Sequence, residues 1–312
     1  MFGPTMASLT IATTASSDST LDCSIVIPSH NRPLQLAKCL EALAAQSFPL
    51  DRFEVVVVND GSDQALGPVA DRFRPTVRLQ LVEQANAGPA RARNVGAMRA
   101  ASPLLAFTDD DCEPDREWVA SLVSAWKRRP ECALGGTVIN SVPQNLYSTA
   151  SQLIVDYLYE HQQESAGHNR LPPFFTTNNL AVSAALFRDL KGFDESFPLP
   201  AAEDREFCDR FQSRGHALVR VPEAIVRHAH SMSLSTFWRQ QRNYGRGAAH
   251  FRRARVARGE PPVPLERWTF YRRLVSYPLH ARRSGPRFRL AALIALSQLA
   301  TAVGYMSENR RI

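Results

Sequence analysis

The sequence predicts an α/β fold in which an open, mostly parallel sheet is covered by helices. Apolar runs typical of buried strands alternate with helical patterns over residues 21–109, and polar clusters follow three of these runs. Because ligands of such sheets bind outside the carboxyl ends of the strands, this order of elements also predicts a binding site at one sheet edge. With 44% hydrophobic residues in a chain of 312, there is enough apolar material for a sizeable core.

Short apolar runs indicate the first two strands. Residues 23–27 form the first run, which stops at Pro28, and leucines then recur at helical spacing over 34–46. Residues 53–63 contain four consecutive valines followed by the turn sequence Asn-Asp-Gly-Ser-Asp. An unbroken valine run is typical of a strand that is buried on both faces, as in a parallel sheet.

The next two strands bring acidic residues to the same edge. Residues 77–84 alternate between apolar and polar positions, and residues 89–101 follow as a helix that Pro89 opens at its first turn. A fourth strand over 103–109 then runs into three consecutive aspartates. We therefore expect three polar clusters to meet at one edge of the sheet: residues 29–32, 59–63 and 109–111.

The second half of the chain is less regular. The expected elements are helices over 115–129, 146–165 and 201–215, strands over 137–139 and 217–230, and basic helices on both sides of a proline-rich break at 260–264. We divide the chain into a leader (1–20), a domain with two halves (21–112 and 113–232, together 21–232) and a basic helical extension (233–312).

Positive charge is concentrated at the C-terminal end. From Arg227 onward there are 17 Arg and 3 Glu, a net +14, which leaves −7 on residues 1–226 of the overall +7. Two interpretations remain open: solvated arginine faces of helices, and attraction towards an anionic membrane surface or an acidic substrate. Nucleic acid is not expected as a partner, because no nucleic-acid-binding motif accompanies the arginines.

Residues 290–306 form an apolar run of 17 residues with a single glutamine. This length is at the lower limit for spanning a bilayer. A packed helix is our first interpretation, an interfacial membrane helix the second and a true span the third.

The cysteines and the N-terminus predict the location of the protein. Five scattered cysteines without a close pair indicate reduced thiols. Residues 1–20 lack the basic start and the apolar stretch of a signal peptide, so we expect a disordered leader. The expected location is cytoplasmic, with peripheral attachment at the inner face of the membrane as an alternative.

The three aspartates at 109–111 have two interpretations. They form either a turn with hydrated carboxylates or part of a cation site, because Mg²⁺ and Mn²⁺ prefer oxygen ligands. In an extended chain Asp109 and Asp111 lean to one side, while Asp110 points away. Neither a Walker-type glycine loop nor a dinucleotide-binding glycine motif is present, so a metal would have to bind much of any phosphate.

Six segments together carry a resemblance to a known family. They are 24–32 (SIVIPSHNR), 55–63 (VVVVNDGSD), 86–96 (NAGPARARNVG), 107–112 (FTDDDC), 178–197 (NNLAVSAALFRDLKGFDESF) and 203–210 (EDREFCDR). Each segment alone is weak, but their shared order is specific. Up to residue 230 the chain resembles the inverting glycosyltransferases of family 2. The resemblance implies a GT-A type fold, in which a Rossmann-like sheet is flanked by helices.

The resemblance implies a nucleoside-diphosphate sugar donor, with UDP as the expected nucleotide, bound by the first half of the domain. The aspartate at Asp60 would contact the base with Arg93 near it, and Asp109 would lie towards the ribose. The donor-binding residues implied in this way are Pro28, His30, Asn31, Arg32, Asp60, Gly61, Ser62, Gly88, Arg93, Asn94, Asp109 and Asp110.

The resemblance further implies Mg²⁺ or Mn²⁺ as cofactor, with Asp111 and Asp109 as ligands. His228 and His230 share one face of a strand, and each is either a packed residue or a further ligand, with His228 preferred. Asp204, with Glu203 beside it, would be the catalytic base. A single carboxylate suffices to deprotonate the acceptor hydroxyl, and the helix dipole would keep Asp204 ionised.

The acceptor is expected to present a hydroxyl on a glycan, a lipid-linked sugar or a small molecule. The resemblance places Asn178, Asn179 and Asp194 beneath it, although the turn over 192–195 could equally be structural, with Asp194 capping a helix. Residues 237–247 either clamp the diphosphate through their arginines or form an amphipathic surface helix. This segment lacks the Q-x-x-R-W sequence of processive synthases, which favours transfer of single sugars.

Two other functions remain as alternatives. A nucleotidyltransferase on a similar fold would need a glycine-rich loop and a lysine after the first strand, and residues 29–32 supply neither. A catalytically inactive, membrane-attached relative is disfavoured because Asp109, Asp111 and Asp204 are all present.

Overall fold

The computed structural model of the chain describes residues 21–164, 173–197, 199, 201–280 and 286–310. The expected leader lies outside the described residues. One sheet of eight strands is present in the described part, in the order β3-β2-β1-β4-β7-β6-β8-β5. The strands are β1 (Cys23–Ser29), β2 (Phe53–Asp60), β3 (Arg78–Gln84), β4 (Leu104–Phe107), β5 (Cys112–Pro114), β6 (Ala133–Asn140), β7 (Leu180–Ser183) and β8 (Leu218–His228). The helices are α1 (Pro33–Ala44), α2 (Gly67–Phe73), α3 (Pro89–Arg99), α4 (Trp118–Arg128), α5 (Leu146–Glu164), α6 (Ala184–Asp189), α7 (Glu203–Ser213), α8 (Leu234–Ala257), α9 (Trp268–His280) and α10 (Arg287–Asn309).

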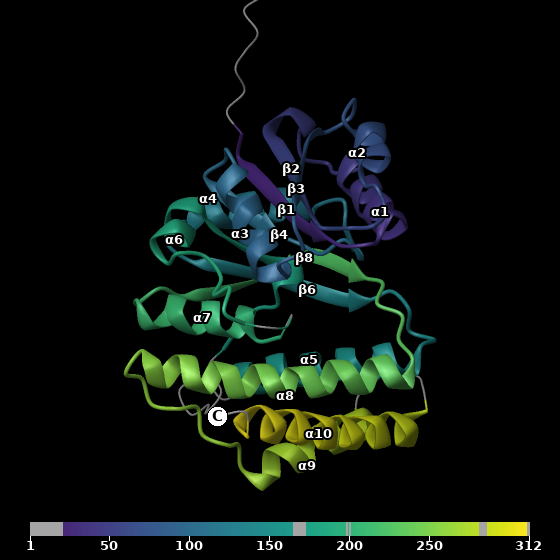
Figure 1. Cartoon of the computed structure of the whole chain (residues 1–312), viewed down its shortest axis with the longest axis vertical. Helices are drawn as coiled ribbons and strands as arrows, with labels where there is room; N and C mark the ends of the chain where they lie inside the picture. The colour runs from purple at the N-terminus through teal and green to yellow at the C-terminus, as the bar shows by residue number, and fades with distance from the viewer. Residues whose placement is uncertain (1–20, 165–172, 198, 200, 281–285, 311–312) are drawn as a thin grey trace, which may run out of the picture.

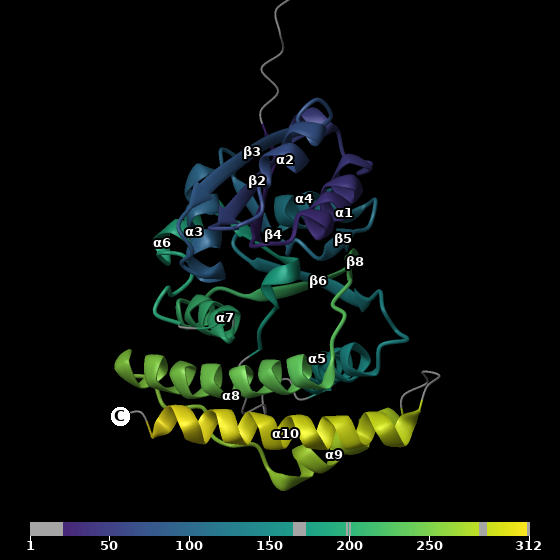
Figure 2. The ribbon, with the colours of Figure 1, turned by 45° about the vertical axis from the view of Figure 1, so that its right-hand side comes forward.

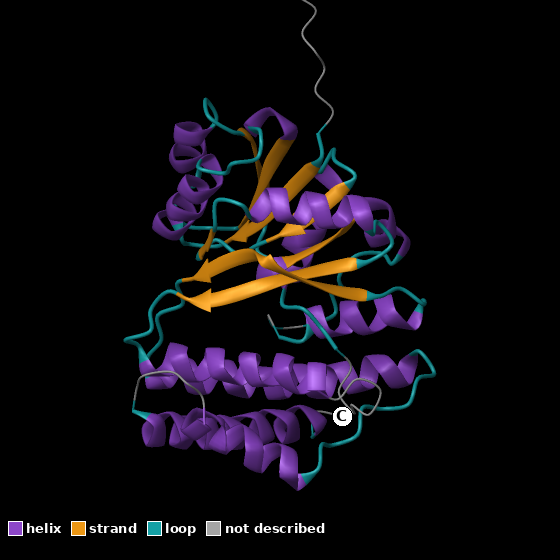
Figure 3. Cartoon of the chain, turned by 180° about the vertical axis from the view of Figure 1, so that it is seen from behind, coloured by secondary structure: helices purple, strands orange, loops and turns teal. Residues whose placement is uncertain are grey.

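Four strands on one side of the sheet have the predicted parallel arrangement. β1 pairs with β2 and β4, and β2 pairs with β3, all in parallel. Every residue of β2 is buried, as expected for a strand that is covered on both faces. Figures 1 and 3 show this sheet standing above layers of helices. The predicted α/β architecture is confirmed.

The other side of the sheet mixes parallel and antiparallel strands. β7 pairs antiparallel with β4 and β6, and β5 pairs antiparallel with β8. The sequence pattern predicts neither β5 nor β7, since strands of three and four residues depend on their partners rather than on their own periodicity. In the β5–β8 register Cys112 lies opposite His228, which brings Asp111 to the end of β8.

Two layers of helices lie below the sheet. α8 and α10 run side by side, and α9 lies next to α10 on the side away from the sheet (Figures 1 and 2). α8 and α10 touch through glycines on both helices. A Cβ atom on Gly245 would overlap the carbonyl oxygen of Thr301, and one on Gly304 would overlap that of Arg242. This close approach holds the last helix against the rest of the protein.

The apolar run over 290–306 is the core of α10. Its buried face contains Leu290, Ile294 and Gly304 and packs towards α8, in agreement with our first interpretation. Leu299 and Val303 are exposed on its other face. Among the described residues, α10 is the one helix long and apolar enough to cross a membrane, with a mean hydropathy of 1.5 and 28% of that stretch buried.

We expect Gly304→Val to separate α8 from α10 and to lower the free energy of unfolding by about 2–3 kcal/mol. Valine has a better helix propensity than glycine, so a loss of stability would report the broken contact rather than a weaker helix. Urea denaturation followed by circular dichroism measures the change. The exposed Ala292→Val on the same helix is the control and should stay within about 0.5 kcal/mol of the wild type. Equal stability of the two variants would contradict the close packing.

Candidate active site

A chamber with a volume of about 1580 Å³ begins at the carboxyl ends of the parallel strands. It contains most of the residues that the sequence nominated for donor, metal, base and acceptor. Thirteen of them line it: Pro28, His30, Arg32, Asp60, Arg93, Asp109, Asp110, Asp111, Asn178, Glu203, Asp204, His228 and His230. Seven do not line it: Asn31, Gly61, Ser62, Gly88, Asn94, Asn179 and Asp194.

Asp60 holds the loop that follows β3. Its carboxylate accepts hydrogen bonds from the backbone N–H groups of Ala87 (2.8 Å) and Gly88 (2.9 Å) and from Nε2 of Gln84 (2.6 Å). Its carbonyl oxygen lies 2.8 Å from Nδ1 of His30. Asp60 therefore shapes one wall of the chamber, and its expected contact with a base stays a prediction. Gln84 was not among the expected site residues, although a polar residue at the end of a predicted strand is a reason to include it.

The residues behind this wall lock two strand-end loops together. The backbone N–H of Asn31 donates to Oγ of Ser62 (2.8 Å), and Oδ1 of Asn31 accepts from the backbone of Asp63 (2.8 Å). Gly61 has a φ of +69°, and a Cβ there would lie 2.6 Å from the backbone nitrogen of Asn86. Asn31, Gly61 and Ser62 thus support the chamber from behind instead of lining it.

Asp110 is buried inside the wall and does not point away from the site as an extended chain would imply. Oγ of Ser29 donates to its carboxylate (2.8 Å), and Nη1 of Arg32 contacts it at 3.1 Å. Burial raises the pKa of Asp110 to about 6, and Arg32 opposes this increase. The chain leaves the extended conformation after β4, which explains the difference. Ser29 was missing from the expected site residues.

Asp111 lies between two histidines and an arginine. Its carboxylate is 3.2 Å from Nε2 of His228, 3.4 Å from Nδ1 of His230 and 2.9 Å from Nη1 of Arg32. Burial alone would raise the pKa of Asp111, but the hydrogen bonds from both histidines and the charge of Arg32 hold it well below its usual range. Burial lowers and Asp111 raises the pKa of His228, with a net increase.

The residues around Asp111 fit a divalent cation. Ligand atoms of Asp111, Cys112 and His228 all lie within 4.8 Å of one another, among the described residues. Carboxylate oxygens suit Mg²⁺ and Mn²⁺, and imidazole is a ligand for transition metals. Burial raises the pKa of the Cys112 thiol well above its usual value, so this thiol stays protonated and is a poor ligand. Asp109 is turned away towards Arg93, with 2.6 Å between Oδ1 and Nη2, so its expected role as a ligand stays a prediction.

The expected base residues begin α7 on the opposite side of the chamber. Arg93 is buried and joins the two sides, because it contacts Glu203 (3.2 Å) as well as Asp109. Ala202, just before α7, has a φ of +71°, an unfavourable conformation for a residue with a side chain. Burial raises the pKa of Asp204, in opposition to the expected effect of the helix dipole. A raised pKa makes a carboxylate a stronger base.

The expected acceptor residues divide into one that lines the chamber and two that do not. Asn178 lines it, and its Oδ1 accepts a hydrogen bond from Thr176 (2.7 Å). Asn179 points into the protein, where its amide bonds Trp118 (2.9 Å) and the backbone of β6 and β8. Because its amide group makes these hydrogen bonds inside the protein, Asn179 is not part of the proposed acceptor site.

The turn around Asp194 is likewise structural. Asp194 accepts a hydrogen bond from the backbone N–H of Ser196 (2.8 Å), which closes the turn. Asn94 donates to the carbonyl of Phe193 (2.9 Å) and accepts from its N–H (2.9 Å). Asn94 therefore ties α3 to this turn, and its expected contact with the donor has no support from its position.

Comparison with known proteins identifies the family of the chain. The family model "Glycosyl transferase family 2" matches residues 24–190, more than half of the chain. The chain belongs to this family. Validoxylamine A glucosyltransferase of Streptomyces hygroscopicus subsp. jinggangensis is 31% identical over 231 residues, which cover 66% of this chain and 54% of that protein. Glycosyltransferase AglE of Haloferax volcanii is 28% identical over 207 residues, or 66% of each chain. The chain thus spans between half and two thirds of the length of these relatives.

Solved structures show the same fold along nearly the whole family 2 chain. The mannosyltransferase PcManGT from Pyrobaculum calidifontis, in complex with GDP-Man and Mn²⁺, has a TM-score of 0.59 at 18% identity, covering 96% of this chain and 81% of that one. S. aureus TarS 1–349 has a TM-score of 0.54 at 18% identity, covering 93% and 91%. Together with the family model, these similarities confirm the predicted GT-A type α/β fold.

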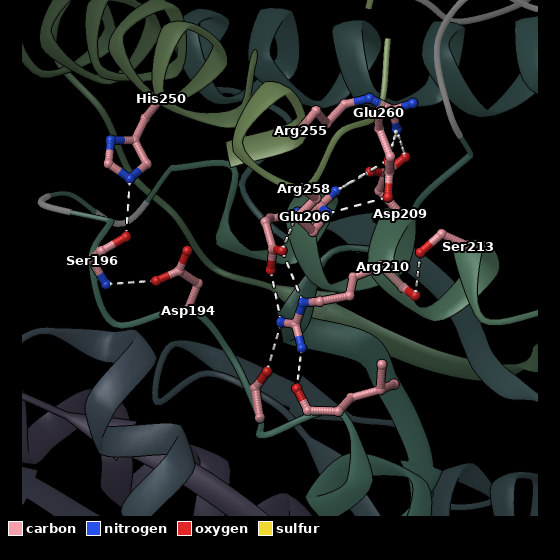
Figure 4. Close-up of polar contacts among 12 residues, drawn as sticks. Asp194, Ser196, Glu206, Asp209, Arg210, Ser213, His250, Arg255, Arg258 and Glu260 are labelled. Atoms are coloured by element: carbon pink, nitrogen blue, oxygen red, sulfur yellow. Dashed lines mark hydrogen bonds and ion pairs between the residues drawn. The ribbon is translucent and has the colours of Figure 1, made fainter. Parts of the chain in front are cut away.

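Helix α7, which begins with the expected base residues, is anchored by ion pairs at its far side (Figure 4). Glu206 contacts Arg210 (2.8 Å) and Arg258 (2.7 Å), while Asp209 contacts Arg255 and Arg258. Arg210 also donates to two carbonyl oxygens of the loop that follows α6. These contacts fix α7 to α8. Part of the positive charge of the C-terminal segment is therefore paired with acidic residues of α7 instead of being solvated at the surface.

We expect Glu203→Gln to stabilise this family 2 chain at pH 8 by about 2 kcal/mol and to leave its stability near pH 4 unchanged. Burial and the charge of Asp204 raise the pKa of Glu203 to about 7, from 4.5. The folded state therefore binds this proton more tightly, so stability is full below pH 4.5 and falls as the pH rises through 7. Urea midpoints of both proteins across this range measure the difference, and parallel pH profiles would contradict the raised pKa.

Proposed function

We propose that this family 2 chain transfers a single sugar from a nucleoside-diphosphate sugar, with UDP as the expected nucleotide, to an acceptor hydroxyl with inversion at the anomeric carbon. One observation carries the proposal: Glu203 and Asp204 line the same chamber as Asp111, His228 and His230. A base on one side and a set of cation ligands on the other are what in-line displacement of a diphosphate requires.

The residues of the chamber divide into three proposed roles. Asp204 takes the proton from the acceptor hydroxyl, and Arg93 sets the position of its neighbour Glu203 through their ion pair. A bound Mg²⁺ or Mn²⁺ would be held by Asp111 with His228 or His230 and would neutralise charge on the leaving diphosphate. Arg32 is the counter-charge of Asp111 in this structure and would contact the diphosphate once the carboxylate is occupied.

The relatives support the donor class. Structures of TarS contain UDP or UDP-GlcNAc, and that of PcManGT contains GDP-Man, so different bases and sugars are bound on this fold. The alternative nucleotidyltransferase has less support, since no lysine lines the chamber among the described residues. The acceptor hydroxyl and a peripheral site at an anionic membrane surface stay proposals.

The experiment that tests the proposed function is a panel of UDP-sugars and GDP-sugars incubated with the full chain and Mn²⁺. We expect the nucleotide diphosphate to be released from one sugar of the panel, and proton NMR of the product to show the opposite anomeric configuration. Retained configuration would contradict the inverting mechanism. Equal affinity for UDP with and without Mn²⁺ in isothermal titration would contradict the metal site.

A further inference from the structure

The chamber continues well past Glu203 and Asp204, and a group of apolar side chains lines one part of it there. Beyond Asp204 it passes between α5 and α8 and reaches α9 and α10, as its lining residues show. The apolar lining includes Ile154 and Leu158 of α5 and Phe270 and Leu274 of α9. A volume of about 1580 Å³ exceeds the roughly 300–1,000 Å³ of ordinary small-molecule pockets. The donor alone therefore leaves a large part of the chamber unfilled.

The outer end of this space also has exposed apolar side chains. Leu265 and Met306 both line the chamber, and they are 77% and 52% exposed. Large exposed apolar side chains at the rim of a cavity offer an apolar chain a first contact from outside. Polar side chains, among them Gln241, Asn243 and Gln298, also line this part of the chamber, so the apolar residues of α5 and α9 form one part of its wall.

We infer that the acceptor carries a long apolar chain, which lies between α5, α8, α9 and α10 while its hydroxyl end reaches Asp204. The position of the hydroxyl end depends on the proposed function. The apolar chain is inferred from the apolar side chains of α5 and α9 and does not depend on that function. In the transfer, the acceptor oxygen bonds the anomeric carbon, the bond from that carbon to the diphosphate oxygen breaks with its electron pair, and the hydroxyl proton goes to Asp204.

The first test measures binding of an apolar chain without any sugar transfer. The probe is 11-(dansylamino)undecanoic acid, whose fluorescence rises in apolar surroundings, and 1-alkanols of 6 to 12 carbons serve as competitors. We expect saturable binding, with competition strengthening by about fourfold for each added methylene. A fluorescence rise that does not saturate, or competition independent of chain length, would overturn the inference.

Two substitutions at Val155 locate the probe. Val155 is partly exposed and lines the chamber, so Val155→Trp fills the space and Val155→Asp makes it polar. Each is expected to weaken probe binding at least about tenfold. The matched control is Leu299→Asp, on the exposed face of α10 outside the chamber, which should leave the affinity unchanged. A tenfold loss in Leu299→Asp with no loss at Val155 would place the chain on the outer surface and overturn the inference. Circular dichroism identifies any variant that fails to fold. In that event, saturable and chain-length-dependent probe binding by the wild type still tests the inference.

The second test separates this inference from the proposed function. Donor turnover is compared with methyl β-glucoside and dodecyl β-glucoside as acceptors. Turnover at least about tenfold higher with the dodecyl compound supports the apolar chain. Turnover that is equal for both acceptors overturns it and leaves the sugar transfer standing. Loss of UDP-sugar binding in Mn²⁺, together with normal probe binding, would contradict the proposed function alone.

Discussion

Asp204→Asn is expected to lower the kcat of sugar transfer by about a thousandfold while the affinity for the donor stays within about threefold. Asparagine has the same shape as aspartate but cannot accept the proton of the acceptor hydroxyl. Asp204 lines the chamber, and burial raises its pKa, which strengthens it as a base. Release of UDP with saturating donor and acceptor measures kcat, and isothermal titration measures donor binding.

The neighbouring carboxylate provides the control for this experiment. Glu203 is in an ion pair with the buried Arg93, so Glu203→Gln keeps one hydrogen bond and should lower kcat by about tenfold at most. Full activity of Asp204→Asn together with an inactive Glu203→Gln would exchange the two roles. Activity in both variants would place the base on another residue.

The first half of the fold could be predicted because its patterns are local. Four consecutive valines in β2 require burial on both faces, and Pro89 opens α3 as expected. The ends of β1, β2 and β4 then follow from parallel pairing, which fixes where Asp60 and the three aspartates meet. That these residues share one edge of the sheet could be predicted without knowledge of contacts between distant segments.

The sequence could not show which polar side chains face the chamber. Asn178 and Asn179 are neighbours in one short turn, and only the close approach of β6, β8 and Trp118 decides that Asn179 points inward. Asp110 depends in the same way on Ser29, which comes from a strand about eighty residues earlier. Such orientations result from tertiary packing, and spacing along the chain does not encode them.

The C-terminal helices show a further limit of pattern reasoning. Their arginines and the apolar run over 290–306 predicted a basic extension, with contact to a membrane as one interpretation, because composition reports only average surface chemistry. In the structure Arg255 and Arg258 pair with acidic residues of α7, and α10 forms the far wall of the chamber. Glycine contacts between α8 and α10 make this arrangement, and a single glycine in a helix gives no directional signal.

Removal of the Asp111 carboxylate, which lies between two histidines, should strongly weaken metal-dependent binding of the nucleotide. Asp111→Ala is expected to weaken binding of UDP in the presence of Mn²⁺ by at least about a hundredfold and to abolish the difference between titrations with and without the metal. Asp111 offers both of its carboxylate oxygens to His228, His230 and Arg32, so no other described residue holds these groups together. Isothermal titration of UDP with and without Mn²⁺ measures the effect.

Matched variants separate the loss of a ligand from a general disturbance of this edge. Glu113 lies two residues further along, on β5, and does not line the chamber, so Glu113→Ala should keep its dependence on Mn²⁺. His228→Ala should weaken metal-dependent binding more than His230→Ala, because His228 is nearer to Asp111 (3.2 Å against 3.4 Å) and belongs to β8, whereas His230 lies beyond its end. If Asp111→Ala retains the full effect of Mn²⁺, the cation is held elsewhere, and the ion pair with Arg32 would then be the whole role of Asp111.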